Sequence, residues 1–180
     1  TWRIIGDASR LAFADRSLYL ADDDFIFVPI EGLLSKKYLK DRSKLLNTKY
    51  KIPTVKPGIP ETKVTLNYHP DMSRELPSTS HISIIDKYGN ILSMTTSIES
   101  SFGSNLMTKS GFLLNNQLTD FSFISHSGGK VVANRIEPGK RPRSSMAPTI
   151  IFKENKPVYI IGSPGGTNII GFVLNAIIGL

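Results

Sequence analysis

The chain of 180 residues contains no cysteine, and only three histidines and one tryptophan. The absence of cysteine excludes disulfide bonds, thiolate zinc sites and a cysteine nucleophile, and it leaves the redox compartment open. The histidines at positions 69, 81 and 126 do not have the spacing of metal ligands, so we expect no metal and no cofactor. Any chemistry must therefore come from hydroxyl groups, carboxylates or isolated histidines.

Long apolar runs are also lacking. The longest run, residues 169–180, is interrupted by Gly171, Asn175 and Gly179 and is shorter than the ~20 residues that a bilayer requires, so it predicts a buried helix and no membrane span. The first residues lack the basic start and apolar centre of a secretion signal. The sequence opens inside an amphipathic helical pattern and stops inside an apolar one without a capping residue, and we therefore expect a fragment.

The net charge is +7, from 22 basic and 15 acidic side chains. Residues 1–78 carry 13 basic and 10 acidic side chains, and residues 79–180 carry 9 and 5, so the excess is spread along the chain. A nucleic-acid-binding protein is therefore the weakest hypothesis, because it rests on the summed charge alone. We expect no nucleic-acid partner.

Hydrophobic spacing divides the chain into unlike parts. Apolar residues at helical spacing predict one helix over residues 2–18 and a second over residues 33–46. Five of the 11 prolines lie between residues 47 and 78, which indicates an extended connector. We expect a helical region at 1–46, a proline-rich connector at 47–78 and a sheet region at 79–180.

Beyond the connector, β-branched residues alternate with polar ones, as in β-strands. The predicted strands form two hairpins and one further short strand, at 79–86 with 91–98, at 149–152 with 158–161, and at 111–114. A glycine-rich turn at 162–166 then leads into the last predicted helix. Helices followed by paired strands indicate an α+β fold with an antiparallel sheet.

Thr79 stands where the connector meets the first strand. It is either an ordinary strand residue or, if the chain is cut before it, a nucleophile whose own α-amine serves as the base. Polar residues near 97–99 and 117–120 place carboxylates and amides close to strand ends. Such a set suits an ammonium group, although the same residue types also form turns.

Hydroxyl groups and glycines follow later in the chain. Ser144 and Ser145 come directly after Arg143, an arrangement that suits a carboxylate but also fits a loop with local backbone bonds. Residues 162–166 lack the Gly-Lys-Ser/Thr ending of a phosphate-binding P-loop. They form either a tight turn or a set of backbone N–H groups, at a helix start, that stabilises a developing oxyanion.

In this order the motifs resemble the γ-glutamyltranspeptidase family, whose members are N-terminal nucleophile hydrolases that cut themselves into a large and a small subunit. The matching segments cover nearly the whole chain and lie at 11–16, 19–22, 78–81, 102–103, 111–117 with 120–121, 140–149 and 162–166. The resemblance implies an αββα sandwich that is incomplete in this chain, with the remainder of both subunits missing. It also implies a periplasmic or secreted protein whose leader is absent from this chain.

The resemblance further implies an activity and a set of site residues. The chain would cleave itself between Ser78 and Thr79, and Thr79 would then transfer the γ-glutamyl group of glutathione, or of a related amide, to water or an acceptor amine through a γ-glutamyl-threonyl ester. The remaining residues that match family positions are Ser97 beside the nucleophile, Glu99, Gln117 and Asp120 for the substrate α-amino group, Ser144 and Ser145 for its α-carboxylate, and Gly165 and Gly166 for the oxyanion.

Two positions depart from the better-known members of the family. Ser97 stands where they have a threonine, and Glu99 stands where they commonly have an asparagine, which leaves open a preference for other acyl groups such as those taken by related acylases. A second hypothesis is an inactive, uncleaved fragment that acts as a structural or binding module. The upstream arginine that pairs with the substrate in the family is not in this chain, which favours this second hypothesis.

Overall fold

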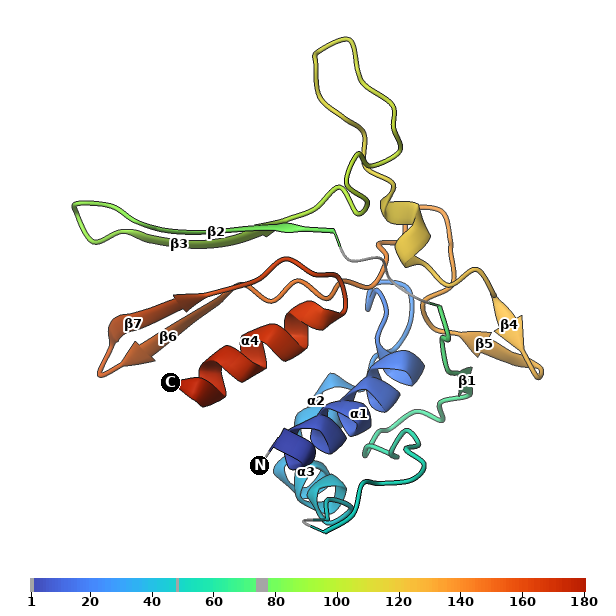
Figure 1. Cartoon of the computed structure of the whole chain (residues 1–180). Helices are drawn as coiled ribbons and strands as arrows, with labels where there is room; N and C mark the ends of the chain where they lie inside the picture. Colours follow the sequence, from blue (N-terminus) through green and yellow to red (C-terminus); the bar gives the residue numbers. More distant parts are fainter. Residues whose placement is uncertain (1, 48, 74–77) are drawn as a thin grey trace. The chain divides into compact units, whose positions relative to one another are not determined.

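The computed structural model describes residues 2–47, 49–73 and 78–180 (Figure 1). The chain forms two compact units. Unit 1 consists of Thr1–Ser73 and Phe121–Arg143, and unit 2 consists of Arg74–Asp120 and Ser144–Leu180. Each unit therefore contains two stretches of the chain that are distant in sequence.

The helices of unit 1 follow the predicted pattern except at one point. Helix α1 (Trp2–Tyr19) confirms the first predicted helix. The second predicted helix is instead two short ones, α2 (Ile30–Leu34) and α3 (Lys36–Ser43). The break falls at Ser35, whose backbone is extended and whose side chain accepts a hydrogen bond from the Tyr38 N–H at 3.2 Å. The single-helix prediction was wrong because the serine acts as an N-cap and restarts the helix.

A buried carboxylate joins α1 to α3. Asp15 Oδ2 accepts a hydrogen bond from the Tyr38 hydroxyl at 2.8 Å, and Asp15 Oδ1 accepts from Arg42 at 3.1 Å and from the Gly58 N–H at 2.7 Å. Burial and the bond to Asp15 raise the pKa of Tyr38 above its ordinary value. These bonds fix the helices and the extended segment that follows them.

Unit 1 also contains a small sheet that was not predicted. Its strands β1 (Tyr68–His69), β4 (His126–Ser127) and β5 (Lys130–Val132) lie in the order β1-β5-β4. The β4 and β5 strands are antiparallel, whereas β1 and β5 are parallel. Phe121, Val132 and Ala133 are buried beside it and form part of the core of unit 1.

Unit 2 is built from two antiparallel hairpins and a helix. Strands β2 (Ser80–Ile85) and β3 (Ile91–Thr96) confirm the first predicted hairpin, and β6 (Thr149–Lys153) and β7 (Lys156–Ile161) confirm the second. Helix α4 (Asn168–Gly179) confirms the last predicted helix and buries Ile169 and Val173. Figure 1 shows the two hairpins side by side, and the Ser93 hydroxyl donates to the Ile161 carbonyl at 3.2 Å between them.

The predicted strand at 111–114 is wrong. Its residues bond only to the stretch just before them, with Leu114 N–H donating to the Leu106 carbonyl and Thr108 N–H donating to the Phe112 carbonyl, both at 2.9 Å. A single bridge, between Met107 and Leu113, results. Gly111, with a φ of 85°, belongs to the turn that brings residues 112–114 back against residues 104–108, but among the described residues this contact gives a bridge and no strand.

The hairpins of unit 2 leave much of their apolar surface uncovered. In β2 every residue except His81 is exposed, including Ile82, Ile84 and Ile85. The fold is a mixed α+β fold, as the sequence indicates, but its strands form three separate small sheets within the described residues. None of the described helices is both long and apolar enough to cross a membrane.

Candidate active site

The structure brings Ser78, Thr79 and Ser97 together at one end of the first hairpin. Ser80 pairs with Thr96, so Thr79 and Ser97 stand opposite each other just beyond the last pair of the ladder. The Ser97 hydroxyl donates a hydrogen bond to the Ser78 carbonyl oxygen at 2.9 Å and accepts one from the Glu99 N–H at 2.9 Å. The predicted scissile carbonyl therefore carries a side-chain donor.

Glu99 is buried and has a φ of 71°, a conformation that few residues other than glycine adopt. Its carboxylate oxygen Oε2 accepts a hydrogen bond from the Asn116 side-chain amide. The Asn116 Oδ1 in turn accepts from the Ser100 N–H at 2.9 Å. Strained backbone held by side-chain bonds is typical of functional sites.

Asn116 contacts a predicted site residue, Glu99, and was not itself among the predicted site residues. The neighbouring Gln117 was chosen because it matches a family position, whereas Asn116 resembled an ordinary turn former. The signal in the sequence is the adjacent pair of asparagines before Gln117: Asn115 accepts from the Gln117 N–H within the turn, and Asn116 reaches back to Glu99.

Gln117 and Asp120 lie together on the 3₁₀-helix η1 (Gln117–Asp120). The Gln117 amide Nε2 donates to Asp120 Oδ2 at 2.6 Å. The other amide atom, Gln117 Oε1, is buried, and no donor reaches it from the part of the chain that the structure describes. Asn116, the residue before Gln117, bonds back to Glu99, so the segment that leads into η1 is joined to Glu99.

The two serines lie at the start of the second stretch of unit 2. Ser144 is exposed, and its hydroxyl accepts from the Met146 N–H at 3.1 Å within its own loop. Ser145 is buried. This loop geometry agrees with the local-bond alternative for Ser144, and it leaves the hydroxyl hydrogen of Ser144 available to another acceptor.

The glycine turn after β7 approaches the beginning of β2. A Cβ atom at Gly162 would overlap the imidazole ring of His81, which lies two residues after Thr79. Gly165 and Gly166 follow with φ values of 132° and 56° and lead into α4. Among the described residues, no acceptor is bonded to either of their N–H groups. Two unpaired donors at a helix start suit a negative charge.

The histidines have structural partners. His81 Nδ1 lies 2.8 Å from the Thr95 hydroxyl and Nε2 lies 3.1 Å from the Ser83 hydroxyl. His69 Nδ1 lies 2.9 Å from the Pro70 carbonyl, and His126 Nδ1 lies 3.1 Å from the Ser125 hydroxyl.

In the described ranges, one cluster of three carboxylates has the spacing of a metal site, and its members are Asp22, Asp23 and Asp24. The guanidinium of Arg141 already lies among these carboxylates, at 2.5 Å from Asp22 and 2.6 Å from Asp24. Its hydrogen bonds hold the pKa of Asp22 well below the usual range. The cluster therefore has its countercharge from the protein itself.

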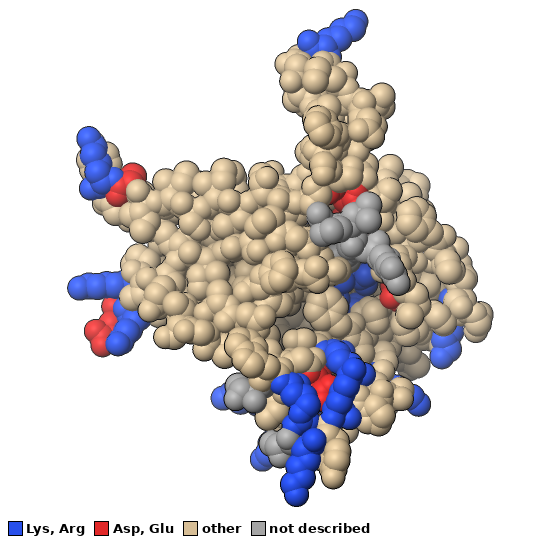
Figure 2. All heavy atoms as spheres, in the orientation of Figure 1, with Lys and Arg blue, Asp and Glu red and all other residues tan. Residues whose placement is uncertain are grey.

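Neither the basic residues nor the main apolar groove coincide with these site residues. Figure 2 shows Lys and Arg in separate groups, and those at the left and the bottom of the view have Asp or Glu beside them. An apolar groove of about 610 Å³ lies between α1 and the α2–α3 pair, and none of the predicted site residues lines it.

The sequence matches the γ-glutamyltranspeptidase family over residues 1–180. It is 40% identical over 183 aligned positions to the glutathione hydrolase proenzyme of Bacillus subtilis, and 37% identical over 184 to that of Escherichia coli. Both alignments cover 98% of this chain and 30% of the relative. The solved structure of LmbA2991T421A is similar with a TM-score of 0.72 and 24% identity, over 94% of this chain and 30% of that one, which supports the fold.

This chain belongs to the γ-glutamyltranspeptidase family. It spans about 30% of the length of the curated relatives that it matches. The resemblance drawn from the motifs is thereby confirmed at the level of the family.

Proposed function

We propose that the protein cleaves itself before Thr79, and the observation that carries this proposal is the hydrogen bond from the Ser97 hydroxyl to the Ser78 carbonyl. A donor on this carbonyl polarises it and stabilises the negative charge that develops on its oxygen under attack. The Thr79 hydroxyl attacks the Ser78 carbonyl carbon, and the peptide C–N bond breaks to give an ester and a free Thr79 amine. Water then hydrolyses the ester and leaves a carboxylate on Ser78.

The freed Thr79 would act as an N-terminal nucleophile. Its α-amine takes the proton of its own hydroxyl as the hydroxyl oxygen attacks the γ-carbonyl of glutathione or a related γ-glutamyl amide. The γ-amide C–N bond breaks, the leaving amine takes the proton, and a γ-glutamyl ester of Thr79 remains. Water or an acceptor amine attacks this ester and regenerates the hydroxyl.

The substrate α-amino group would lie against Glu99, Gln117 and Asp120. The connected carboxylates balance its charge, and the buried Gln117 Oε1 is an acceptor for one of its N–H groups. A buried acceptor without a partner is costly, so a ligand that donates to it gains binding free energy. The Glu99 carboxylate in place of a neutral amide strengthens the preference for a cationic group.

The negatively charged groups, namely the substrate α-carboxylate and the oxyanion that forms during the reaction, would lie against the remaining site residues. Ser144 and Ser145 supply hydroxyl donors for the α-carboxylate. The N–H groups of Gly165 and Gly166 would receive the oxyanion of the tetrahedral intermediate, because they have no other acceptor in the described structure.

The complete protein would have the αββα sandwich of N-terminal nucleophile hydrolases. The exposed apolar residues of β2 need a covering layer, which the rest of a longer chain can supply. In this arrangement residues 1–46 form the helical end of the large subunit, residues 47–78 connect it to the cleavage site, and residues 79–180 contribute the catalytic sheet region.

The test is the intact mass and the N-terminal sequence of the purified full-length natural chain after incubation at neutral pH. We expect a product that begins Thr-Ser-His, and hydrolysis of a chromogenic γ-glutamyl anilide by the cleaved protein. For the 180-residue chain alone the products would be about 9 and 11 kDa, in proportion to their lengths. Thr79→Ala should abolish both reactions, whereas Thr79→Ser should retain them because it keeps the hydroxyl.

Thr96→Ala is the matched control, because Thr96 is an exposed threonine at the end of the neighbouring strand. It should leave cleavage unchanged. A single intact species without turnover, for the natural chain, would contradict the proposal and favour the second candidate, an uncleaved structural or binding module. The uncovered apolar surface of the first hairpin is the observation on which that second candidate rests.

A further inference from the structure

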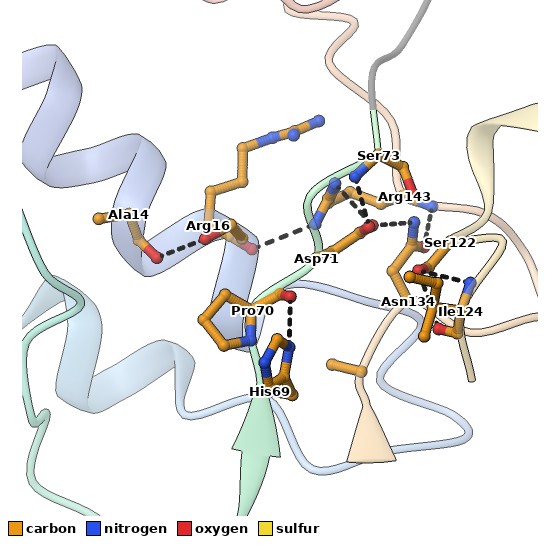
Figure 3. Close-up of polar contacts among 12 residues, drawn as sticks. Ala14, Arg16, His69, Pro70, Asp71, Ser73, Ser122, Ile124, Asn134 and Arg143 are labelled. Atoms are coloured by element: carbon orange, nitrogen blue, oxygen red, sulfur yellow. Dashed lines mark hydrogen bonds and ion pairs between the residues drawn. The ribbon is translucent and has the colours of Figure 1, made fainter. Parts of the chain in front are cut away.

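A buried polar cluster in unit 1 joins segments that are far apart in sequence (Figure 3). Asp71 Oδ2 accepts hydrogen bonds from Arg143 Nη2 and from Asn134 Nδ2, both at 3.1 Å. Asn134 Oδ1 accepts from the backbone N–H of Arg143 at 3.0 Å, which closes a ring of three residues. The side chain of Asp71 is 0% exposed and that of Arg143 is 5% exposed.

The same cluster is attached to the end of α1. The Asp71 N–H donates to the Ser17 carbonyl at 2.8 Å, and Arg143 Nη1 donates to the Arg16 carbonyl at 3.4 Å. Figure 3 shows this bond at the Arg16 backbone, where the end of α1 meets the cluster. The Ser73 N–H also donates to Asp71 Oδ1 at 3.0 Å.

These residues lie on both sides of the proposed cleavage point. Asp71 and α1 precede the Ser78–Thr79 bond, whereas Asn134 and Arg143 follow it. Since unit 1 consists of Thr1–Ser73 and Phe121–Arg143, cleavage would make it a unit of two chains. Non-covalent contacts within unit 1 must then contribute to holding the two products together.

We propose that Asp71, Asn134 and Arg143 form the clasp that keeps the two cleavage products associated, an inference that rests on the self-cleavage proposed above. Asp71 anchors the first product seven residues before its new C-terminus. Arg143 anchors the second product at the residue directly before Ser144. The clasp therefore fixes both products next to functional segments of their own chains.

Burial explains why this cluster matters more than the surface ion pairs. Burial opposes ionisation of Asp71, but the hydrogen bonds from Ser73 and Asn134 and the charge of Arg143 outweigh it, so the pKa of Asp71 lies below its ordinary value. Removing the charge of one residue leaves the opposite charge buried without this ion pair. The pair of Arg141 and Asp22 also spans the cleavage point, but Arg141 is 67% exposed, so water screens its charge.

The experiment separates the clasp from self-cleavage. In the full-length natural chain, Thr79→Ala blocks self-cleavage, and a recognition sequence for a specific protease inserted between Ser73 and Ser78 allows the chain to be cut at will. The dissociation constant of the two cut products is then measured by dilution and size-exclusion chromatography. The variants are Asp71→Asn, Arg143→Leu, their combination and the control Asp41→Asn.

Asp71→Asn and Arg143→Leu should each raise the dissociation constant about a hundredfold or more, because each removes one charge of a buried ion pair and leaves the opposite charge in the interior. The double variant removes both charges and should dissociate less readily than either single variant. Asp41→Asn removes an exposed carboxylate that pairs with Lys44 of the same product, and it should change the constant by about twofold at most.

Three results would overturn the clasp. The first is an equal dissociation constant for Asp71→Asn and Asp41→Asn, and the second is a double variant whose dissociation constant rises by the product of the two single effects, as for independent residues. The third is unfolding of the uncut Asp71→Asn chain to the same extent as the cut one, which would indicate a local structural role only. Failure of the natural chain to cleave itself would contradict the proposed function instead, and the protease-cut chain would still report on the clasp.

Discussion

Replacing Ser97 by alanine removes the hydroxyl that donates to the Ser78 carbonyl at 2.9 Å, and we expect the rate of self-cleavage to fall steeply. When Thr79 attacks this carbonyl, the carbonyl oxygen gains negative charge. The hydrogen bond from Ser97 therefore strengthens in the transition state, and its loss raises the barrier more than it destabilises the uncleaved chain.

The magnitude follows from the kind of bond that is lost. One donor to a developing oxyanion contributes about 3 kcal/mol to the barrier, which corresponds to a fall in rate of about a hundredfold. Ser97 also accepts from the Glu99 N–H at 2.9 Å, and this bond holds the strained backbone at Glu99. Ser97→Thr keeps the hydroxyl and should cleave at a rate close to that of the natural protein.

The assay follows the appearance of the product with an N-terminal Thr79 over time by denaturing electrophoresis and mass spectrometry. Ser93→Ala is the matched control, since Ser93 lies on β3, the strand that ends just before Ser97, and also donates to a backbone carbonyl, that of Ile161, at 3.2 Å. Each alanine variant should lose a similar stability of about 1 kcal/mol. Only Ser97→Ala should lose the hundredfold in rate.

Two outcomes would refute this reasoning. Cleavage of Ser97→Ala at the natural rate would mean that the bond to Ser78 does not assist the reaction. Equal slowing in Ser97→Ala and Ser93→Ala would mean that a general loss of hairpin stability, and not the donor on the scissile carbonyl, controls the rate.

Three further predictions concern stability. Gly162→Ala should destabilise unit 2 by about 1 to 3 kcal/mol in urea unfolding, because the added Cβ would push the His81 ring away from its two hydroxyl partners. An unchanged urea midpoint would contradict the close approach of Gly162 to His81. Tyr38→Phe should cost unit 1 about 1.5 to 3 kcal/mol by removing a donor to the buried Asp15 carboxylate, and a neutral effect in the same assay would contradict this. Because the pKa of Asp71 is lowered on folding, its contribution to stability is present above about pH 4 and is lost as the pH falls below that value; Asp71→Asn should show a weaker acid dependence of the urea midpoint.

The elements that the sequence predicted well are those whose signals are local. Alternating β-branched residues and short polar turns determine the hairpins of unit 2, and helical spacing determines α1 and α4. The second helix was predicted too long because apolar spacing continues through Ser35, and only its side-chain bond shows that the serine begins a new helix. The strand at 111–114 is absent because its residues form one bridge with the stretch just before them, and the apolar pattern does not show how far such a pairing extends.

Contacts between distant segments could not be predicted from the sequence. The parallel pairing of Tyr68 with Val131 joins two strands too short to give a periodic signal. The same holds for Asp71 and Arg143, which are 72 positions apart and give no local pattern. In the candidate site, the position of Ser97 opposite Thr79 follows from hairpin register, whereas the reach of Asn116 to Glu99 depends on the path of the whole intervening loop.

The division into two units separates the two proposed tasks of the protein. Every predicted site residue, from Ser78 to Gly166, belongs to unit 2, whereas the clasp residues belong to unit 1. Asp71→Asn should therefore leave chemistry at high protein concentration nearly unchanged and reduce activity on dilution, as the two products separate. Ser97→Ala should do the opposite, because it slows cleavage at every concentration and leaves the buried pair intact. If one of these variants both slowed the chemistry at every concentration and lost further activity on dilution, the two tasks would not be separable between the two units.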